Sequence, residues 1–223
     1  MWHETTYNFI IVGAGSAGCV LASGPSMAGG IARTEPSLEL PDIQLHFNPF
    51  SGAQPGRSHS FDGCTYIISQ LRPDSRGELR LVSADPFAQP KMVANYLATE
   101  TDRRVTIDGV RLVRRIMAQP AMLQFGAKEV APGPSAIDDQ QLLTHIRAAR
   151  YTQFHPTCSC RMGNDPSAVV DPELRVRGTA GLLVFDASIM PSLVSGNTNA
   201  TTIMIAEKAS DLYLNNPALA RAV

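Results

Sequence analysis

The sequence predicts a mixed α/β (α+β) fold in which both chain ends build a Rossmann-like part and the middle builds an antiparallel-sheet part. Near the N-terminus, an apolar segment at 7–12 runs into a Gly-rich turn and a helix start. Near the C-terminus, an apolar run at 182–185 precedes a helix-forming segment at 200–212. Between them, residues 42–47 alternate apolar and polar side chains, which is the period of a half-buried strand.

Composition limits the classes of function. The chain has 223 residues, 44% of them hydrophobic and 17% charged, which is enough for one or two globular domains. A net charge of -1 gives no indication of nucleic-acid or anionic-membrane binding. No apolar run is long enough to span a membrane, and no secretory signal pattern begins the chain. The four cysteines lack zinc-ligand spacing, so we read them as reduced thiols in the cytoplasm and expect no metal site.

The Gly-rich turn at 13–18 has the spacing G-x-G-x-x-G between a strand and a helix. Gly13 permits the turn, Gly15 lets a pyrophosphate approach the backbone, and Gly18 lets the helix pack on the strand. This pattern is typical of FAD or NAD binding. The dinucleotide pattern then breaks off, because the helix breakers at 23–30 replace the rest of the expected helix and second strand. The sequence therefore reads as though a large internal segment is missing after about residue 22.

The middle of the chain predicts strands and two helices. Residues 42–47, 65–71 and 78–82 read as strands of one antiparallel sheet within residues 30–83. The clearest helix spans 99–119, with Thr99 or Thr101 as its cap and an apolar stripe that we assign to the core. A shorter helix is expected from 138 to 149.

Many ordered segments resemble the glucose–methanol–choline (GMC) flavoprotein oxidoreductases. The segment that carries most of this resemblance reads His155-Pro156-Thr157-Cys158-Ser159-Cys160-Arg161-Met162-Gly163. Further matching segments lie at 7–22, 41–47, 71–77, 83–87, 95–97, 169–172, 186–191 and 195–207. The commoner family form has Gly-Thr where this chain has Cys158-Ser159, and a Cys there resembles some choline dehydrogenases.

The resemblance implies a reaction in which an alcohol loses its hydroxyl proton to a base and a hydride to FAD. His155 matches the family's catalytic histidine, and Asn197 matches the second active-site position, which would hold the developing alkoxide. A neutral imidazole is suited to accept a proton near pH 7, and an amide at a helix start adds a donor beside a favourable dipole. The residues implied in FAD binding are Gly13, Gly15, Ser16, Ala17, Gly18, Asp186, Ala187, Asn197 and Thr198.

The resemblance also implies a domain division. Residues 1–23 and 151–216 would form the remnant of the FAD-binding domain, with the strand at 7–12 beside 182–185 and a helix at 199–213 packed on them. Residues 24–150 would form the substrate-binding domain, and His155 and Asn197 should approach each other. The substrate would be a small alcohol, with the electron acceptor left open. The alternatives are an internally deleted, inactive remnant that holds no FAD and at most binds a partner, and NAD instead of FAD at the turn.

Overall fold

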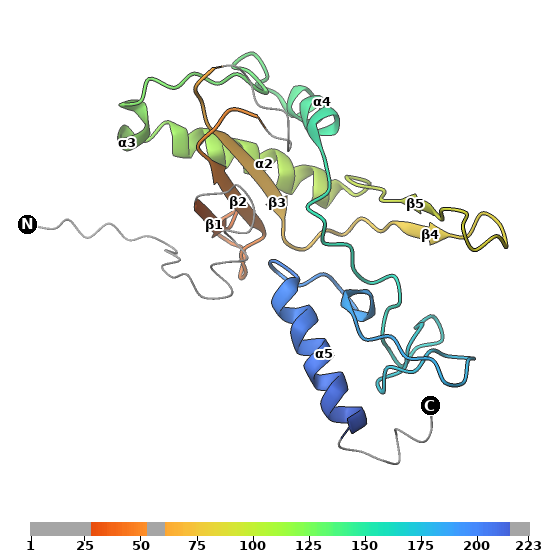
Figure 1. Ribbon diagram of the computed structural model, residues 1–223. Coiled ribbons are helices and arrows are strands. Elements are labelled where there is room, and N and C mark those ends of the chain that lie inside the picture. Colours follow the sequence, from red (N-terminus) through yellow and green to blue (C-terminus); the bar gives the residue numbers. More distant parts are fainter. Residues whose placement is uncertain (1–27, 53–60, 215–223) are drawn as a thin grey trace, which may run out of the picture. The chain divides into compact units, whose positions relative to one another are not determined.

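The computed structural model describes residues 28–52 and 61–214, which divide into two compact units (Figure 1). The described part of the first unit is 28–52, 61–75 and 97–152. That of the second is 76–96 and 153–214. The predicted strand at 7–12 and the Gly-rich turn at 13–18 lie outside the described residues.

The first unit contains a three-stranded antiparallel sheet in the order β1-β2-β3. Its strands are β1 (Ala28–Ala32), β2 (Ile43–Asn48) and β3 (Thr65–Gln70), with Ile43 opposite both Ala32 and Gln70. The predicted strands at 42–47 and 65–71 are thereby confirmed. Strand β1 was not predicted, because residues 28–32 contain two glycines and do not alternate between apolar and polar side chains. Pairing along the edge of β2 supplies the backbone hydrogen bonds that local propensity does not.

The two longer helices of this unit form where the sequence predicts them, whereas the short helix α3 (Pro120–Leu123) was not predicted. Helix α2 (Glu100–Met117) begins at Thr99, whose hydroxyl accepts a hydrogen bond from the Asp102 amide, and α3 follows it. Helix α4 (Asp139–Ala149) begins with a capping box in which Asp138 and Gln141 satisfy each other's backbone amides. Within the described part of the chain, no helix is both long and apolar enough to cross a membrane.

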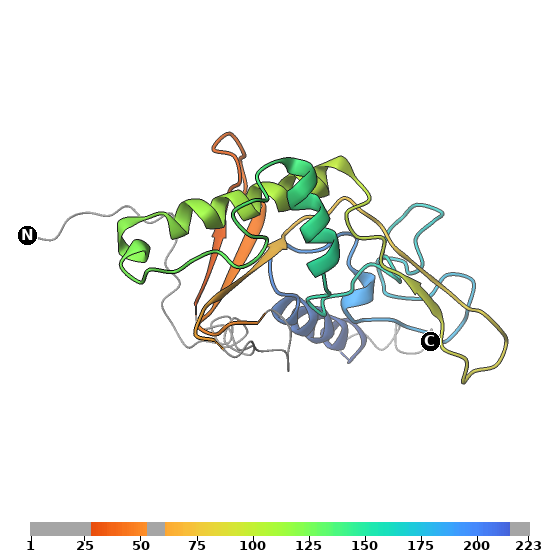
Figure 2. The ribbon, with the colours of Figure 1, turned by 90° about the horizontal axis from the view of Figure 1, so that it is seen from above.

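Helix α2 packs on the sheet on one side and on α4 on the other (Figures 1 and 2). On the sheet side, Gly109 allows close approach, since an added Cβ would stand 2.3 Å from Ile43 Cδ1 and 2.7 Å from Ile68 Cγ2. On the other side, the buried cluster joins α2 to α4. It consists of Ile107, Val110, Ala136, Leu142, Leu143 and Ile146. Of the apolar stripe expected on this helix, only Val105 is buried. Its other members, Leu112, Val113, Ile116 and Met117, are half-buried, and the helix contributes Ile107 and Val110 to the core instead.

Asp102 ties the start of α2 to the loop that follows β3. Its carboxylate accepts hydrogen bonds from Gln70 Nε2 at 2.9 Å, from the Asp74 amide at 2.8 Å and from the Ser75 amide at 2.9 Å. The residue is 2% exposed. Burial opposes ionisation, but the hydrogen bonds from Ser75, Asp74 and Gln70 outweigh it and lower the pKa of Asp102. A buried carboxylate thus fixes the loop at 71–77.

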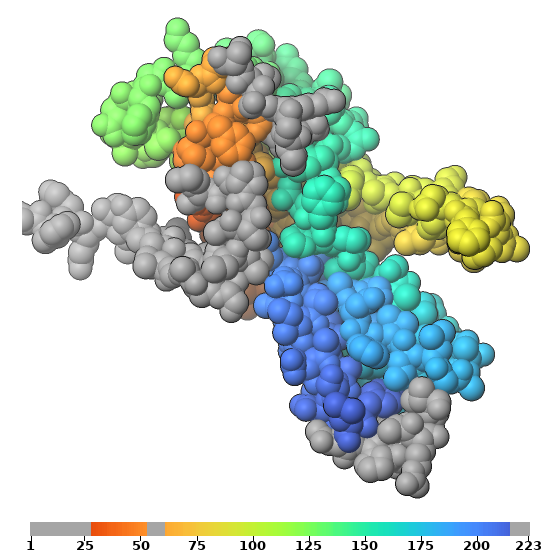
Figure 3. Space-filling view, viewed as in Figure 1, coloured from red at the N-terminus to blue at the C-terminus, as the bar shows by residue number. Residues whose placement is uncertain are grey.

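The second unit contains a separate hairpin of β4 (Glu78–Arg80) and β5 (Lys91–Val93). The prediction that 78–82 belongs to the same sheet as 42–47 is therefore wrong. Residues 78–80 do form a strand, but a local pattern does not reveal which partner a strand pairs with, and here the partner is β5 across a loop. Leu79 and Met92 face each other across the hairpin and are 55% and 70% exposed. The hairpin is part of the yellow segment in Figure 3.

The rest of this unit surrounds a small core of its own. Val170, Leu174, Ile189 and Ala209 are buried together, which joins the loops at 160–185 to the short 3₁₀ helix η1 (Ala187–Ile189) and to helix α5 (Asn199–Leu214). The predicted helix at 199–213 is confirmed. Among the described residues, the run at 182–185 does not form the predicted buried parallel strand. Leu183 makes an isolated antiparallel bridge to Arg175, and Leu182 and Phe185 are 49% and 45% exposed. The partner predicted for this run, at 7–12, lies outside the described residues. An apolar run becomes a buried strand only with neighbouring strands on both sides, which this segment lacks within the described residues.

Candidate functional site

The candidate site is built around a contact between His155 and the start of α5. His155 Nδ1 lies 2.8 Å from Thr198 Oγ1, although the two residues are 43 positions apart in the sequence. His155 is half-buried and Thr198 is 7% exposed. Asn197, the predicted alkoxide partner, precedes Thr198 in the chain and is also half-buried. The structure therefore brings the two predicted catalytic segments together in one unit through Thr198.

The electrostatic environment of His155 favours the neutral ring. Burial lowers the pKa of its imidazole below the ordinary value of 6.5. An imidazole in this setting is uncharged at pH 7 and carries one nitrogen with a free lone pair. Because Nδ1 faces Thr198, Nε2 is the ring nitrogen that this contact leaves open.

The backbone on both sides of His155 has an uncommon conformation. Phe154 has φ 59° and Cys158 has φ 70°, both in the left-handed region that costs non-glycine residues free energy. The value at Cys158 gives a physical reason for the commoner family form noted above, since glycine enters this region without a Cβ clash. Strained backbone that persists at a candidate site is itself an indication of functional constraint.

The segment after His155 is held against η1 by two backbone hydrogen bonds. The Cys160 amide donates to the Ser188 carbonyl at 3.0 Å, and the Met162 amide donates to the Ile189 carbonyl at 2.9 Å. Ile189 belongs to the buried cluster that includes Ala209 of α5. The histidine segment, η1 and α5 are thereby joined through hydrogen bonds and a shared core.

Two predicted cofactor residues lie at the start of η1. Asp186 is its N-cap, and Asp186 Oδ1 accepts from the Ser188 amide at 2.8 Å and from the Ser188 hydroxyl at 2.5 Å. Its side chain is exposed, and Ala187 is half-buried. The carboxylate keeps Oδ2 and its remaining lone pairs available for a further donor, such as a ribityl or ribose hydroxyl.

The first turn of α5 offers donors for an electron-rich group. Thr198 starts this helix, since its carbonyl accepts from the Thr202 amide and from the Thr202 hydroxyl, both at 2.9 Å. The first four amides of an α-helix have no acceptor within the helix, and the helix dipole adds positive potential there. Asn199 and Ala200 are exposed at this end. Together with a neutral His155, this donor set fits the edge of a flavin ring. The predicted phosphate-binding residues at 13–18 lie outside the described residues.

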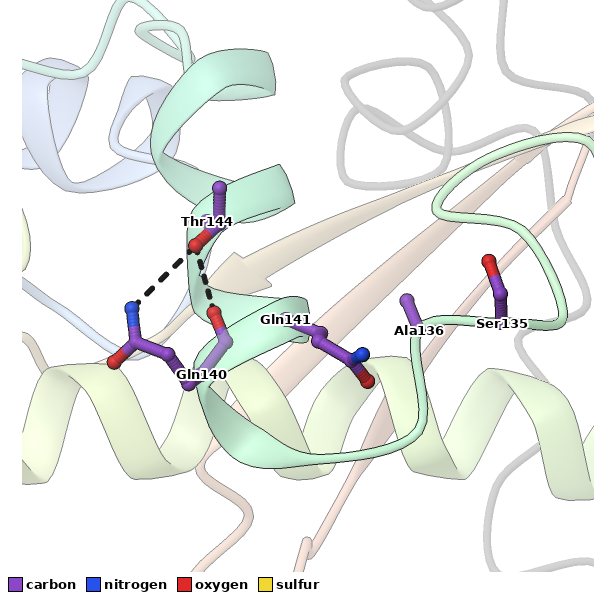
Figure 4. A pocket seen from close by; sticks show the side chains of 5 residues that line it. All are labelled: Ser135, Ala136, Gln140, Gln141 and Thr144. Atoms are coloured by element: carbon purple, nitrogen blue, oxygen red, sulfur yellow. Dashed lines mark hydrogen bonds between the residues drawn. The ribbon is translucent and has the colours of Figure 1, made fainter.

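A shallow pocket lies elsewhere, at the start of α4 in the first unit (Figure 4). Its lining residues are Ser135, Ala136, Gln140, Gln141 and Thr144. Their polar groups already serve the helix itself: Gln141 Oε1 accepts from the Ile137 and Asp138 amides, and the Thr144 hydroxyl donates to the Gln140 carbonyl. The lining contains no titratable side chain, so this pocket has no group suited to proton transfer.

Comparison with known proteins identifies the family. A sequence model of the GMC oxidoreductases matches residues 73–206, which include the histidine segment, η1 and the first turns of α5. The chain belongs to the GMC oxidoreductase family. The oxygen-dependent choline dehydrogenase of Pseudomonas putida is 44% identical over 205 residues, covering 90% of this chain and 36% of the relative. The chain thus spans about a third of the length of the curated relatives that it matches.

Solved structures agree with this assignment. Pyridoxine 4-oxidase from Mesorbium loti superposes with a TM-score of 0.76 at 26% identity, covering 86% of this chain and 38% of that one. A fungal aryl-alcohol oxidase superposes with a TM-score of 0.64 at 30% identity, covering 79% of this chain and 28% of that one. The mixed α/β fold with antiparallel sheets is therefore that of GMC oxidoreductases.

One contact of this candidate site was not predicted from the sequence. Thr198 was expected only to line the cofactor, whereas the structure places its hydroxyl on the ring of the predicted base. The sequence does show a residue with a hydroxyl, Thr198, next to Asn197 at a helix start. It does not show that His155 is the residue this hydroxyl contacts, because no local pattern connects positions 155 and 198.

Proposed function

We propose that this chain carries the proton-accepting side of an FAD-dependent alcohol oxidoreductase of the choline dehydrogenase type. His155 accepts the hydroxyl proton of the substrate at Nε2, and Asn197 donates a hydrogen bond to the oxygen as it becomes an alkoxide. Bound FAD would supply the acceptor for the hydride that leaves the carbinol carbon. The observation that carries the proposal is the half-buried His155, whose pKa is lowered by burial and whose Nδ1 is engaged at the start of α5.

Support for the cofactor comes from the residues that would hold it. Thr198 and Asn197 stand at the start of α5, where helix amides suit the electron-rich edge of a flavin, and Asp186 and Ala187 begin η1 beside the histidine segment. We assign the isoalloxazine edge to α5 and the ribityl region to η1. The domain division into an FAD-binding part at 1–23 and 151–216 and a substrate-binding part at 24–150 is part of the same proposal.

The substrate class follows from the relatives. The curated relatives that match at 42–44% identity are choline dehydrogenases, whereas the pyridoxine, aryl-alcohol and formate oxidases match at 26–30%. We therefore assign a small primary alcohol, with choline as the first candidate. The free thiols of Cys64, Cys158 and Cys160 support a cytoplasmic location.

The test is turnover of choline, pyridoxine and an aryl alcohol by the purified chain loaded with FAD, with oxygen and with an artificial dye as acceptors. His155→Ala should abolish turnover, while His145→Ala on α4 serves as the matched control and should retain it. The rate should fall on the acid side with an apparent pKa below 6.5, because protonation of His155 removes the base. Turnover that survives His155→Ala would refute the assignment. A chain that neither binds FAD nor turns over any alcohol would favour the inactive-remnant alternative.

A further inference from the structure

The contact between His155 and Thr198 determines which ring nitrogen of the histidine carries the proton. Thr198 Oγ1 lies 2.8 Å from Nδ1, and a hydroxyl either donates to this nitrogen or accepts from it. If the hydroxyl donates, Nε2 carries the ring proton and has no lone pair for a substrate. If it accepts, Nδ1 carries the proton and Nε2 is the base. The direction of this one hydrogen bond therefore decides whether His155 can act.

Thr198 is well placed to hold the ring in one orientation. Its side chain is 7% exposed, and its carbonyl is fixed by two hydrogen bonds from Thr202 in the first turn of α5. A β-branched side chain has few χ1 rotamers, and the contact with Nδ1 uses the one that directs the hydroxyl at the ring. Asn197 precedes it on the same turn, which ties the orientation of the base to that of its partner.

The neighbourhood also disfavours a second proton on the ring. The positive end of the α5 dipole lies beside the contact, and no carboxylate is hydrogen-bonded to His155 in the described part of the chain. The role that a buried Asp plays in a Ser-His-Asp triad, orienting the imidazole and selecting its tautomer, falls here to a neutral hydroxyl. A neutral partner selects the tautomer without raising the affinity of the ring for a proton.

We propose that Thr198 is a positioning residue that accepts a hydrogen bond from His155 Nδ1–H and keeps Nε2 unprotonated. This inference rests on the proposed function, because the need for a base at Nε2 fixes the direction of the hydrogen bond. Thr198 acts through His155 and leaves the substrate oxygen to Asn197.

The first test reads the tautomer without any turnover. In the ¹⁵N-labelled chain at a pH above 6.5, the His155 ring should show a pyrrole-type Nδ1 and a pyridine-type Nε2. Thr198→Ser keeps the hydroxyl and should keep this pattern, whereas Thr198→Val, which is nearly isosteric, should lose it. Thr144→Val removes a hydroxyl from α4 in the first unit, which donates to the Gln140 carbonyl, and should leave the ring unchanged. A pyridine-type Nδ1 in the unmodified chain, or an unchanged pattern in Thr198→Val, would overturn the proposal.

The second test uses the FAD-loaded chain. By comparison with partners that orient histidine in metal sites, Thr198→Val should lower kcat by roughly 10- to 100-fold. KM should change little, and Thr198→Ser should restore kcat. Equal kcat in Thr198→Val and the unmodified chain would refute the positioning role. If His155→Ala retains turnover while the tautomer pattern is as expected, the proposed function fails and the Thr198 contact stands, so the two failures are distinguishable.

Discussion

Asp102 offers the sharpest test of how the first unit is held together. Its buried carboxylate accepts hydrogen bonds that include those from Gln70 and from the amides of Asp74 and Ser75. Asp102→Asn keeps the shape but replaces one acceptor oxygen by an NH₂ donor. The new side-chain NH₂ group then faces one of the buried N–H donors, which costs about 1–3 kcal/mol. The hydrogen bonds to the remaining oxygen are weakened, because their acceptor is no longer charged. Together these effects predict a loss of about 3 kcal/mol in the free energy of unfolding.

The assay is urea denaturation at pH 7, compared with Glu100→Gln as the matched control. Glu100 lies in the same first turn of α2, but its side chain is 84% exposed, so its loss should cost no more than about 0.5 kcal/mol. The folded-state pKa of Asp102 is lowered, so its stabilisation is present above the unfolded value near 3.9 and is lost as pH falls through the folded value. Asp102→Asn should therefore remove part of the acid sensitivity. If both variants unfolded at the same urea concentration, the reasoning would be refuted.

Three other predictions concern packing and backbone. Gly109→Ala should destabilise the chain by about 1–3 kcal/mol despite its better helix propensity, because its Cβ meets Ile43 and Ile68, whereas Gly30→Ala in open space should be neutral in urea denaturation. Cys158→Gly should be more stable than Cys158→Ala by about 1 kcal/mol in the free energy of unfolding, and should unfold at a higher temperature, since glycine adopts φ 70° without strain. Equal stability of the two variants would contradict this. Paired lysine substitutions at Leu81 and Phe87, which are 85% and 89% exposed, should reduce binding of a hydrophobic dye while changing stability by about 0.5 kcal/mol or less; unchanged dye binding would show that the dye binds elsewhere.

The helices could be predicted because their signals are local. Thr99 and Asp138 are side-chain caps a few residues from the amides that they satisfy, and both helices start where the sequence places them. Gly109 was not recognised as a packing residue, although a glycine four positions after Val105 on a helical stripe indicates close approach. Propensity alone reads that glycine as a weak point in the helix.

The sheets could be predicted only in part, because strand pairing is not local. The alternation in 42–47 and the strand-like composition of 65–71 predicted β2 and β3. No pattern in 28–32 predicted β1, and none in 78–82 predicted pairing with β5. The run at 182–185 shows the reverse case. Its composition suits a buried strand, yet burial depends on neighbours that this segment does not have among the described residues.

The candidate site was predicted from motif resemblance more than from physics. The resemblance named His155 and Asn197, while the structure adds the 2.8 Å contact with Thr198 and the two backbone hydrogen bonds that hold the histidine segment on η1. Those contacts join segments that are distant in sequence, so no local pattern could reveal them. The assignment of His155 and Asn197 as a catalytic pair stays a prediction.

The most direct test of the proposed function is the visible absorption spectrum of the purified chain after addition of FAD and removal of the unbound cofactor. We predict flavin bands that co-elute with the protein and bleach when choline is added without oxygen. His155→Ala should keep the bands and lose the bleaching, because the base is removed while the residues assigned to cofactor binding remain. A protein that stays colourless with FAD, or bleaching that persists in His155→Ala, would contradict the proposal.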